Sequence, residues 1–445
     1  MLSQGCISTH KSNNAEPVAR LIVLDPGHFH AALLQKYMNN DVDSTVYVFA
    51  PEGPDVKAHL ALINDYNNRK ENPTNWEEKV YTGPDYLEKM LRNKPGNVVV
   101  ISGNNRLKTD YIQKSVNAGL NVLADKPMAI NSFGFLQLKN AFADAEKNKV
   151  LLYDIMTERY QITNILQKEF SRFADIFGDL EKGSLEKPAV SMESKHYFFK
   201  EVSGSPLVRP DWYYDTEQEG EGIVDVTSHM VDLVQWECFS EVNLDYKKDV
   251  QMLAAKRWAT VITPSQFRQS TGKEYPDFLK KDLKDSLLNV YANGEMNYTI
   301  KGVHARVSVE WKFQAPEGSG DTYFSIMRGT KANLIIRQGE DQKYKPVLYI
   351  EPVNKNSEDE WNQSLQEALK KIQQKYSGVK LSESENGWQV IIPDSFKIGH
   401  EQQFALVVKK YIQYLKEGKM PEWEISSMLA KYYTTTQALE KALNQ

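Results

Sequence analysis

The chain has 445 residues and a net charge of -5, and these totals exclude several classes of protein. It is too long for one ordinary hydrophobic core, so we expect at least two domains. An apolar share of 41% and a charged share of 25% are typical of a globular protein. Lys and Arg are spread along the chain, which predicts no surface for nucleic acid. No apolar run approaches the roughly 18 residues that span a bilayer, so no transmembrane segment is predicted.

Residues 1–18 form a polar segment before the first predicted strand. The segment contains Cys6, which ends the run Leu2-Ser3-Gln4-Gly5-Cys6. This run resembles the end of a bacterial lipoprotein signal, although the charged and apolar parts of such a signal do not precede it. Two interpretations stay open. Either the segment tethers a periplasmic or envelope-associated protein to a lipid on Cys6, or it is the disordered tail of a cytoplasmic protein. Cys238 is the other cysteine, and the two predict neither a disulfide framework nor a zinc site.

Residues 19–155 alternate between short apolar runs and helical patterns. The predicted strands are residues 20–24, 45–49, 97–101, 121–124 and 150–153. Strands that alternate with helices predict right-handed crossovers and a parallel sheet. The first strand leads through the tight turn Asp25-Pro26-Gly27-His28-Phe29-His30 into a helical pattern that reaches Met38, as at the opening of a dinucleotide-binding unit. We therefore expect an α/β Rossmann domain over residues 19–155.

Ligands of such a sheet bind beside the carboxyl ends of its strands. Glu52 follows the second strand, where a ribose hydroxyl is usually held. Asp25 brings a negative charge into the first turn, and we expect it to repel a phosphate unless His28 or His30 offsets the charge. The predicted cofactor contacts are Gly27, His28, Phe29, His30, Glu52, Ser102, Gly103, Asn104, Asp125 and Lys126.

Residues 156–395 have a different pattern, which predicts an α+β domain with a mainly antiparallel sheet. Asn293-Gly294 lies between two alternating runs and is a strong hairpin signal. The face of this sheet is expected to lie against the first domain or a second subunit, which predicts a homo-oligomer. Residues 396–445 are predicted to form helices that pack back on the body. The alternating runs are residues 251–261, 287–291, 295–300, 305–313, 322–327 and 333–337.

The segment from Asp225 to Asp232 is a candidate for chemistry. On a helix, Asp225, His229 and Asp232 would share one face. A carboxylate beside a histidine can fix its tautomer and raise its basicity, which suits a general base. The same side chains could ligate a metal or could merely stabilise the start of a helix. Lys126, which follows a buried strand and precedes Pro127, is either a positioned cation or a lysine at the rim of a loop.

The spacing of these motifs resembles the Gfo/Idh/MocA oxidoreductases, the family of glucose-fructose oxidoreductase and inositol dehydrogenase. Asp125-Lys126-Pro127 stands where the family has Glu-Lys-Pro, and the segment from Gly220 to Asp232 stands where it has a glycine-rich turn and Asp-x-Gly-x-His-x-x-Asp. The first turn keeps only the middle glycine of Gly-x-Gly-x-x-Gly. A subgroup of sugar and glycoside oxidoreductases from gut Bacteroidetes is similar in its Asp-Pro-Gly-His-Phe-His-Ala start.

The resemblance implies an NAD(P)-dependent oxidoreductase, with NAD preferred, that acts on a secondary hydroxyl of a pyranose or glycoside to give, for example, a 3-keto sugar. It implies that Lys126 polarises the hydroxyl oxygen, that His229 takes the proton and that Asp225 orients His229. Two alternatives are an NAD-dependent glycosidase that works by oxidation and elimination, and a non-catalytic protein that binds a sugar or nucleotide.

A carbohydrate substrate also fits the residues near these motifs. The segment Arg209-Pro210-Asp211-Trp212-Tyr213-Tyr214 mixes stacking surfaces with groups that bind hydroxyls, although these aromatic residues could equally pack under a loop. We assign no metal site, while noting that His196, Asp225 and His229 together could bind a divalent ion. The predicted substrate contacts are Lys195, His196, Arg209, Trp212, Tyr213 and Asp232.

Overall fold

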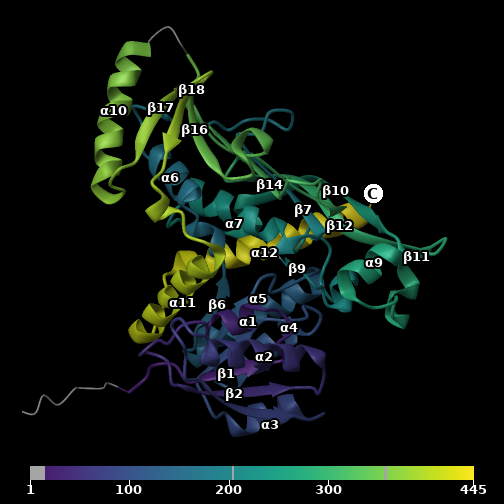
Figure 1. The fold of residues 1–445 in the computed structure, drawn as a ribbon. Coiled ribbons are helices and arrows are strands. Elements are labelled where there is room, and N and C mark those ends of the chain that lie inside the picture. Colours follow the sequence, from purple (N-terminus) through teal and green to yellow (C-terminus); the bar gives the residue numbers. More distant parts are fainter. Residues whose placement is uncertain (1–15, 203–204, 355–357, 445) are drawn as a thin grey trace, which may run out of the picture.

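A parallel sheet forms the N-terminal part of the chain, as predicted, and it has six strands rather than the five predicted (Figure 1). In this computed structural model residues 16–202, 205–354 and 358–444 are described. The strand order is that of a Rossmann fold, and the chain reverses direction across the sheet between β1 and β4. In spatial order the strands are β3 (Glu77–Thr82), β2 (Thr45–Ala50), β1 (Leu21–Leu24), β4 (Val98–Ile101), β5 (Asn121–Asp125) and β6 (Leu152–Ile155).

Helices connect the strands of this sheet. The first connection is unusual, because α1 is a single turn that ends at Leu33, whereas the sequence predicts a helix as far as Met38. An acidic residue, Asp55, lies in the first turn of the next helix. The helices are α1 (His30–Leu33), α2 (Pro54–Asn68), α3 (Tyr86–Asn93), α4 (Lys108–Asn117) and α5 (Ser132–Asn148).

The second sheet has ten strands and is antiparallel except where β13 pairs with β7 in parallel. The predicted hairpin at Asn293-Gly294 is wrong, because both residues lie inside the continuous strand β12. The order is β10 (Val250–Ile262), β12 (Leu287–Ile300), β13 (Val303–Gln314), β7 (Val190–Phe199), β14 (Thr322–Arg328), β15 (Ala332–Gln338), β16 (Val347–Pro352), β18 (Gly387–Ile391) and β17 (Lys380–Ser384), and β11 (Leu283–Lys284) pairs with β12.

Helices cover this sheet and connect it to the first domain. The α-helices are α6 (Ile162–Ser171), α7 (Thr227–Cys238), α8 (Tyr246–Asp249), α9 (Pro264–Thr271) and α10 (Glu358–Lys375). The short 3-10 helices are η1 (Thr157–Tyr160), η2 (Asp211–Tyr214), η3 (Asp277–Asp282), η4 (Glu340–Gln342) and η6 (Asp394–Phe396), and β8 (Glu201–Val202) pairs with β9 (Ser205–Pro206).

The two C-terminal helices, α11 (His400–Glu417) and α12 (Glu422–Leu443), lie between the two sheets in Figure 1. Phe404, Val407 and Tyr411 of α11 belong to the hydrophobic core of the N-terminal sheet. Ala438 and Leu439 of α12 belong to the core of the second sheet. These helices therefore join the domains. Within the described residues no helix is long and apolar enough to cross a membrane, and the predicted anchor residue Cys6 lies outside those residues.

Candidate functional site

The first turn is stabilised by a hydrogen bond from outside the turn, which its own sequence does not predict. Asp25 has a φ of 46°, a left-handed conformation that Asp tolerates better than most residues. Its carboxylate accepts a hydrogen bond of 2.8 Å from the hydroxyl of Tyr111. Burial raises the pKa of Asp25 despite this bond. The carboxylate that is expected to repel a phosphate is therefore held by a hydrogen bond from Tyr111.

Asp125, at the end of β5, is the centre of a buried polar cluster. Its Oδ2 lies 2.8 Å from Nδ1 of His30 and 3.3 Å from Nδ1 of His28. The hydroxyl of Ser102 donates to the same oxygen at 3.0 Å, and the amide of Lys126 donates to Oδ1 at 2.9 Å. Burial alone would raise the pKa of Asp125, but the two histidines hold it well below its ordinary value. The predicted cofactor residues of three loops thus meet at one carboxylate.

Lys126 forms an ion pair with Asp225. The structure thus brings the lysine of the first domain together with the catalytic segment predicted in the second domain. Burial lowers the pKa of the Lys126 ammonium, but Asp225, Asp125 and Glu219 outweigh it and leave this pKa raised. Asp225 lies in the turn before α7 and contacts Lys126 rather than His229. The predicted arrangement, with Asp225 on one helix face orienting His229, is therefore wrong for this carboxylate.

Two further charged residues of this cluster were missed by the sequence reasoning. Nζ of the buried Lys108 donates to the backbone oxygen of Asp125 at 3.1 Å, and burial lowers the pKa of Lys108 to about 8. Glu219 accepts a hydrogen bond of 3.2 Å from Asn105, and burial together with Asp225 raises the pKa of Glu219 well above its ordinary value. No motif marks Lys108, but Glu219 directly precedes the glycine-rich turn.

His229 lies on α7 with its Nδ1 buried and without a hydrogen-bond partner among the described residues. Burial and the ammonium of Lys126 lower the pKa of His229 well below its ordinary value. The imidazole is therefore neutral at neutral pH and has a free lone pair, which a proton acceptor requires.

Asp232 does not share this site. Its carboxylate accepts two hydrogen bonds from Arg159, at 2.6 and 2.8 Å, and one of 2.8 Å from Lys431. All three side chains are buried, and Lys431 also pairs with Asp154 at 2.6 Å. The prediction that Asp232 contacts substrate is therefore not supported by its position, which is that of a structural ion cluster between α7 and α12.

A cavity of about 360 Å³ lies beside His229 and is lined by residues of α6, α7, β7, β14 and the start of α11. His196 lines it and contacts Asp321 at 3.2 Å. Lys195 points to the opposite face of the sheet, where it pairs with Glu310 at 3.0 Å, because successive strand residues alternate. Thus His196 lines this cavity, whereas Lys195 does not. The metal set of His196, Asp225 and His229, which the sequence analysis considered but did not assign, is not assembled, since Asp225 is held by Lys126.

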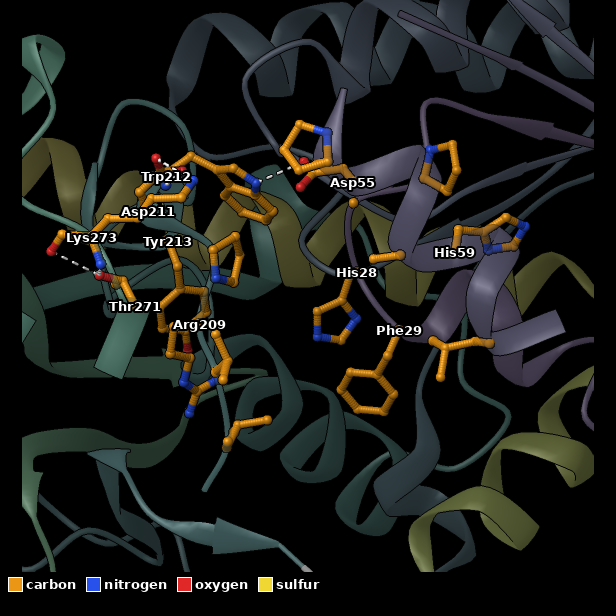
Figure 2. Close-up of a pocket in the computed structure, with 18 residues that line it drawn as sticks. His28, Phe29, Asp55, His59, Arg209, Asp211, Trp212, Tyr213, Thr271 and Lys273 are labelled. Carbon is orange, nitrogen blue, oxygen red and sulfur yellow. Dashed lines mark hydrogen bonds and ion pairs between the residues drawn. The ribbon is translucent and has the colours of Figure 1, made fainter. Parts of the chain in front are cut away.

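A second cavity of about 370 Å³ lies between the first turn, the start of α2 and residues 207–213 (Figure 2). Nε1 of Trp212 donates to Asp55 at 2.9 Å and so connects the two domains across this cavity. Arg209 stacks over Tyr213, 4.5 Å from the ring centroid. The predicted ribose ligand Glu52 is exposed and pairs weakly with Lys57, at 4.0 Å. Asp55, which the sequence reasoning missed, lines the cavity instead, as does Asp211.

The cleft around the first turn suits a dinucleotide. A Cβ on Gly27 would meet Oδ2 of Asp55 at 3.0 Å and Trp212 at 3.4 Å, so a glycine is needed for these two side chains to lie so close to the first turn. Gly103 packs on the same turn, since its Cβ would lie 2.7 Å from the Gly27 nitrogen. Asn104, the remaining predicted cofactor residue, bonds to Gln218 at 2.7 Å.

Two families of known proteins match most of the chain. A family described as "Oxidoreductase family, NAD-binding Rossmann fold" matches residues 27–154, and one described as "Putative oxidoreductase C terminal domain" matches residues 166–443. No protein of curated function matches the chain.

Solved structures of similar proteins cover nearly the whole chain. A protein from Parabacteroides merdae, described as a "putative oxidoreductase", is 52% identical, with a TM-score of 0.95 over 97% of this chain and 99% of that one. The 3-ketoreductase KijD10 of Actinomadura kijaniata, in complex with NADP and TDP-benzene, is 13% identical, with a TM-score of 0.54 over 93% and 94%. GenD2 from gentamicin A biosynthesis, in complex with NAD, is 14% identical, with a TM-score of 0.55 over 100% and 97%. At such identities the last two show a likeness of fold alone. The chain belongs to the Gfo/Idh/MocA oxidoreductase family and combines its NAD-binding Rossmann domain with an oxidoreductase C-terminal domain.

Proposed function

We propose that the protein is a nicotinamide-dependent oxidoreductase that oxidises a secondary hydroxyl of a pyranose or glycoside, or reduces the corresponding keto sugar. The observation that carries this proposal is the cavity beside His229. Three of its side-chain atoms, Oγ1 of Thr163, Oδ1 of Asn164 and Oδ1 of Asp321, are buried without a hydrogen-bond partner, as is Nδ1 of His229. Buried polar groups are nearly always paired, so a ligand rich in hydroxyls suits this lining.

The cofactor would be held by the first turn, the Gly103 loop and Asp55. A bound nicotinamide supplies a hydride acceptor, which none of the side chains provides. Asp55 supports NAD rather than NADP, because a carboxylate beside the cleft accepts a ribose hydroxyl and repels a 2′-phosphate.

The chain's own residues would manage the proton and the charge. His229 is neutral at neutral pH and so is able to take the hydroxyl proton as a general base. The Lys126 ammonium, kept charged by Asp225, would stabilise the negative charge that develops on the same oxygen. A fixed cation in a site shielded from water stabilises such charge far more than one in water. Asp225 thus positions Lys126.

The relatives add support. KijD10 is a 3-ketoreductase solved with NADP, and GenD2 was solved with NAD. Proteins of this fold therefore bind either cofactor, and one of them is a ketoreductase. We also propose that the protein is a homo-oligomer, as the sequence predicts, and that it acts in the bacterial envelope, which is one of the two interpretations that residues 1–18 leave open.

The test measures dinucleotide binding by fluorescence and NADH formation with a panel of methyl glycosides. We expect Lys126→Ala to lower kcat by at least about 100-fold, as expected for the loss of a charge-stabilising group. Lys195→Ala is the matched control and should keep full turnover, because Lys195 lies on the other face of the sheet.

Three outcomes separate the alternatives. Absence of dinucleotide binding at millimolar supply would contradict every enzyme hypothesis and favour a sugar-binding protein. Release of free sugar without net NADH would favour the NAD-dependent glycosidase. Equal loss of turnover in both lysine variants would contradict the role of Lys126.

A further inference from the structure

We infer that His28, His30 and Asp125 form a binding site for one divalent transition-metal ion, such as zinc. This site adjoins the first turn, which is proposed to hold the cofactor, and it differs from the metal set considered from the sequence. Among the described residues, these three offer ligand atoms that all lie within 4.8 Å of one another. Two imidazole nitrogens and one carboxylate oxygen are the donor set of many catalytic metal sites, which keep further positions open for water or a ligand.

The distances suit a shared ion. Oδ2 of Asp125 lies 2.8 Å from Nδ1 of His30 and 3.3 Å from Nδ1 of His28. With bonds of about 2.0 to 2.2 Å to each donor, neighbouring ligand atoms are about 3 Å apart in an octahedral site and about 3.4 Å apart in a tetrahedral one.

Hydrogen bonds alone leave Oδ2 of Asp125 crowded. A carboxylate oxygen has two lone-pair sites, whereas Oδ2 faces three groups, the Ser102 hydroxyl and both histidine nitrogens. In one tautomer Nδ1 of His28 accepts a hydrogen bond of 3.4 Å from the backbone N–H of His30, and its lone pair then faces Oδ2 of Asp125 at 3.3 Å. A cation between these two atoms would remove the repulsion of their lone pairs.

The surroundings complete the site. Nε2 of His30 lies 2.7 Å from Nε2 of His400 and can donate its proton there when Nδ1 is a ligand. Metal-ligating histidines usually donate a hydrogen bond from their second nitrogen in this way. Ligating carboxylates usually accept hydrogen bonds as well, and Asp125 accepts them from the Ser102 hydroxyl and the Lys126 amide. The charge of Lys126 is offset by Asp225, so it does not exclude a cation.

The test uses the full chain stripped with a chelator and titrated with Co²⁺, which reports its coordination by visible absorption, and with Zn²⁺ in thermal unfolding. We expect about one Co²⁺ per chain and a Zn²⁺-dependent rise in Tm. His28→Ala should weaken binding at least tenfold. It should fold, because the His28 side chain is 31% exposed. Ser102→Ala should weaken binding about tenfold without removing a ligand.

The control is His304→Ala, which removes a histidine of β13 far from the first turn and should bind Co²⁺ as the wild type does. Absence of Co²⁺ absorption, absence of a Zn²⁺-dependent rise in Tm, or equal binding by His28→Ala and wild type would each overturn the inference. Dinucleotide fluorescence measured on the same samples keeps this result separate from that of the proposed function.

Discussion

Asp225 and Asp232 flank His229 and have opposite roles. Asp225 holds the Lys126 ammonium in the cleft, whereas Asp232 is enclosed by Arg159 and Lys431. Burial would raise the pKa of Asp232, but these two cations hold it below its ordinary value. The two side chains are chemically identical, and their different roles follow from their positions, since Asp225 lies before α7 and Asp232 lies within it.

Replacing each carboxylate by its amide separates the two roles. Asp232→Asn should lower the free energy of unfolding by about 3 to 5 kcal/mol, because it leaves buried cations without their partner. Asp225→Asn should lower turnover with a smaller loss of stability. Urea unfolding followed by circular dichroism measures both, and the exposed Asp175→Asn is the control. Equal stability of Asp232→Asn and wild type would contradict the structural role.

His59 of α2 makes the folded state sensitive to acid. Both ring nitrogens are buried without a partner among the described residues, and burial lowers the pKa of His59 to about 4. Below the ordinary histidine pKa of 6.5 the unfolded chain binds a proton that the folded chain does not, so stability falls as the pH falls. From pH 8 to about pH 5 this histidine should cost about 2 kcal/mol.

His59→Leu should remove that part of the acid sensitivity and leave the rest. The measurement is urea unfolding of variant and wild type at both pH values. The same difference between the two pH values in both proteins would show that His59 does not titrate with a lowered pKa.

At the scale of the element, β12 determines where the turn before α7 lies. A Cβ on Gly294 would meet Cβ of Ile223 at 2.5 Å, and one on Gly222 would meet the backbone oxygen of Ala292 at 1.7 Å. The turn that carries Asp225 is therefore pressed against the strand, and neither glycine leaves room for a side chain.

Gly294→Ala should lower the free energy of unfolding by about 1 to 3 kcal/mol, as overpacking does. It should also lower turnover, because a shift of Ile223 moves Asp225. Gly53→Ala is the control, since a Cβ at Gly53 meets nothing within 4 Å. A Gly294→Ala variant as stable and active as the control would contradict this coupling.

The alternation of apolar runs and helical patterns was enough to predict the parallel sheet. Predictions that depended on one or two residues failed where tertiary contacts determine the local structure. Asn293-Gly294 has the chemistry of a turn, yet Asn293 bonds to the backbone of Trp258 at 3.0 Å and of Trp311 at 2.6 Å and so stays in the strand. Lys195 and His196 were predicted in one cleft although strand neighbours point to opposite faces. Asp55 could not be preferred over Glu52, because the choice depends on how α2 approaches Trp212.

For the whole molecule, the contact between Trp212 and Asp55 closes the cleft over the first turn. Trp212 is 7% exposed and lies against Gly27, where a dinucleotide would approach. We therefore predict that cofactor entry requires this contact to open.

Trp212→Ala should speed NADH association several-fold, measured by stopped-flow NADH fluorescence. Trp258→Ala, at an exposed position of β10, is the control and should leave the rate unchanged. Equal association rates for Trp212→Ala and wild type would show that the contact does not limit entry.

The place of α11 in the core of the N-terminal sheet has a consequence for protein synthesis. Phe404, Val407 and Tyr411 complete a core whose strands end at Ile155. A ribosome releases the first domain long before it makes these residues, so the apolar surface they cover stays open until translation is nearly finished. The first domain to be synthesised is thus among the last to be completed, and a chaperone that shields apolar surface should associate with the nascent chain during this interval.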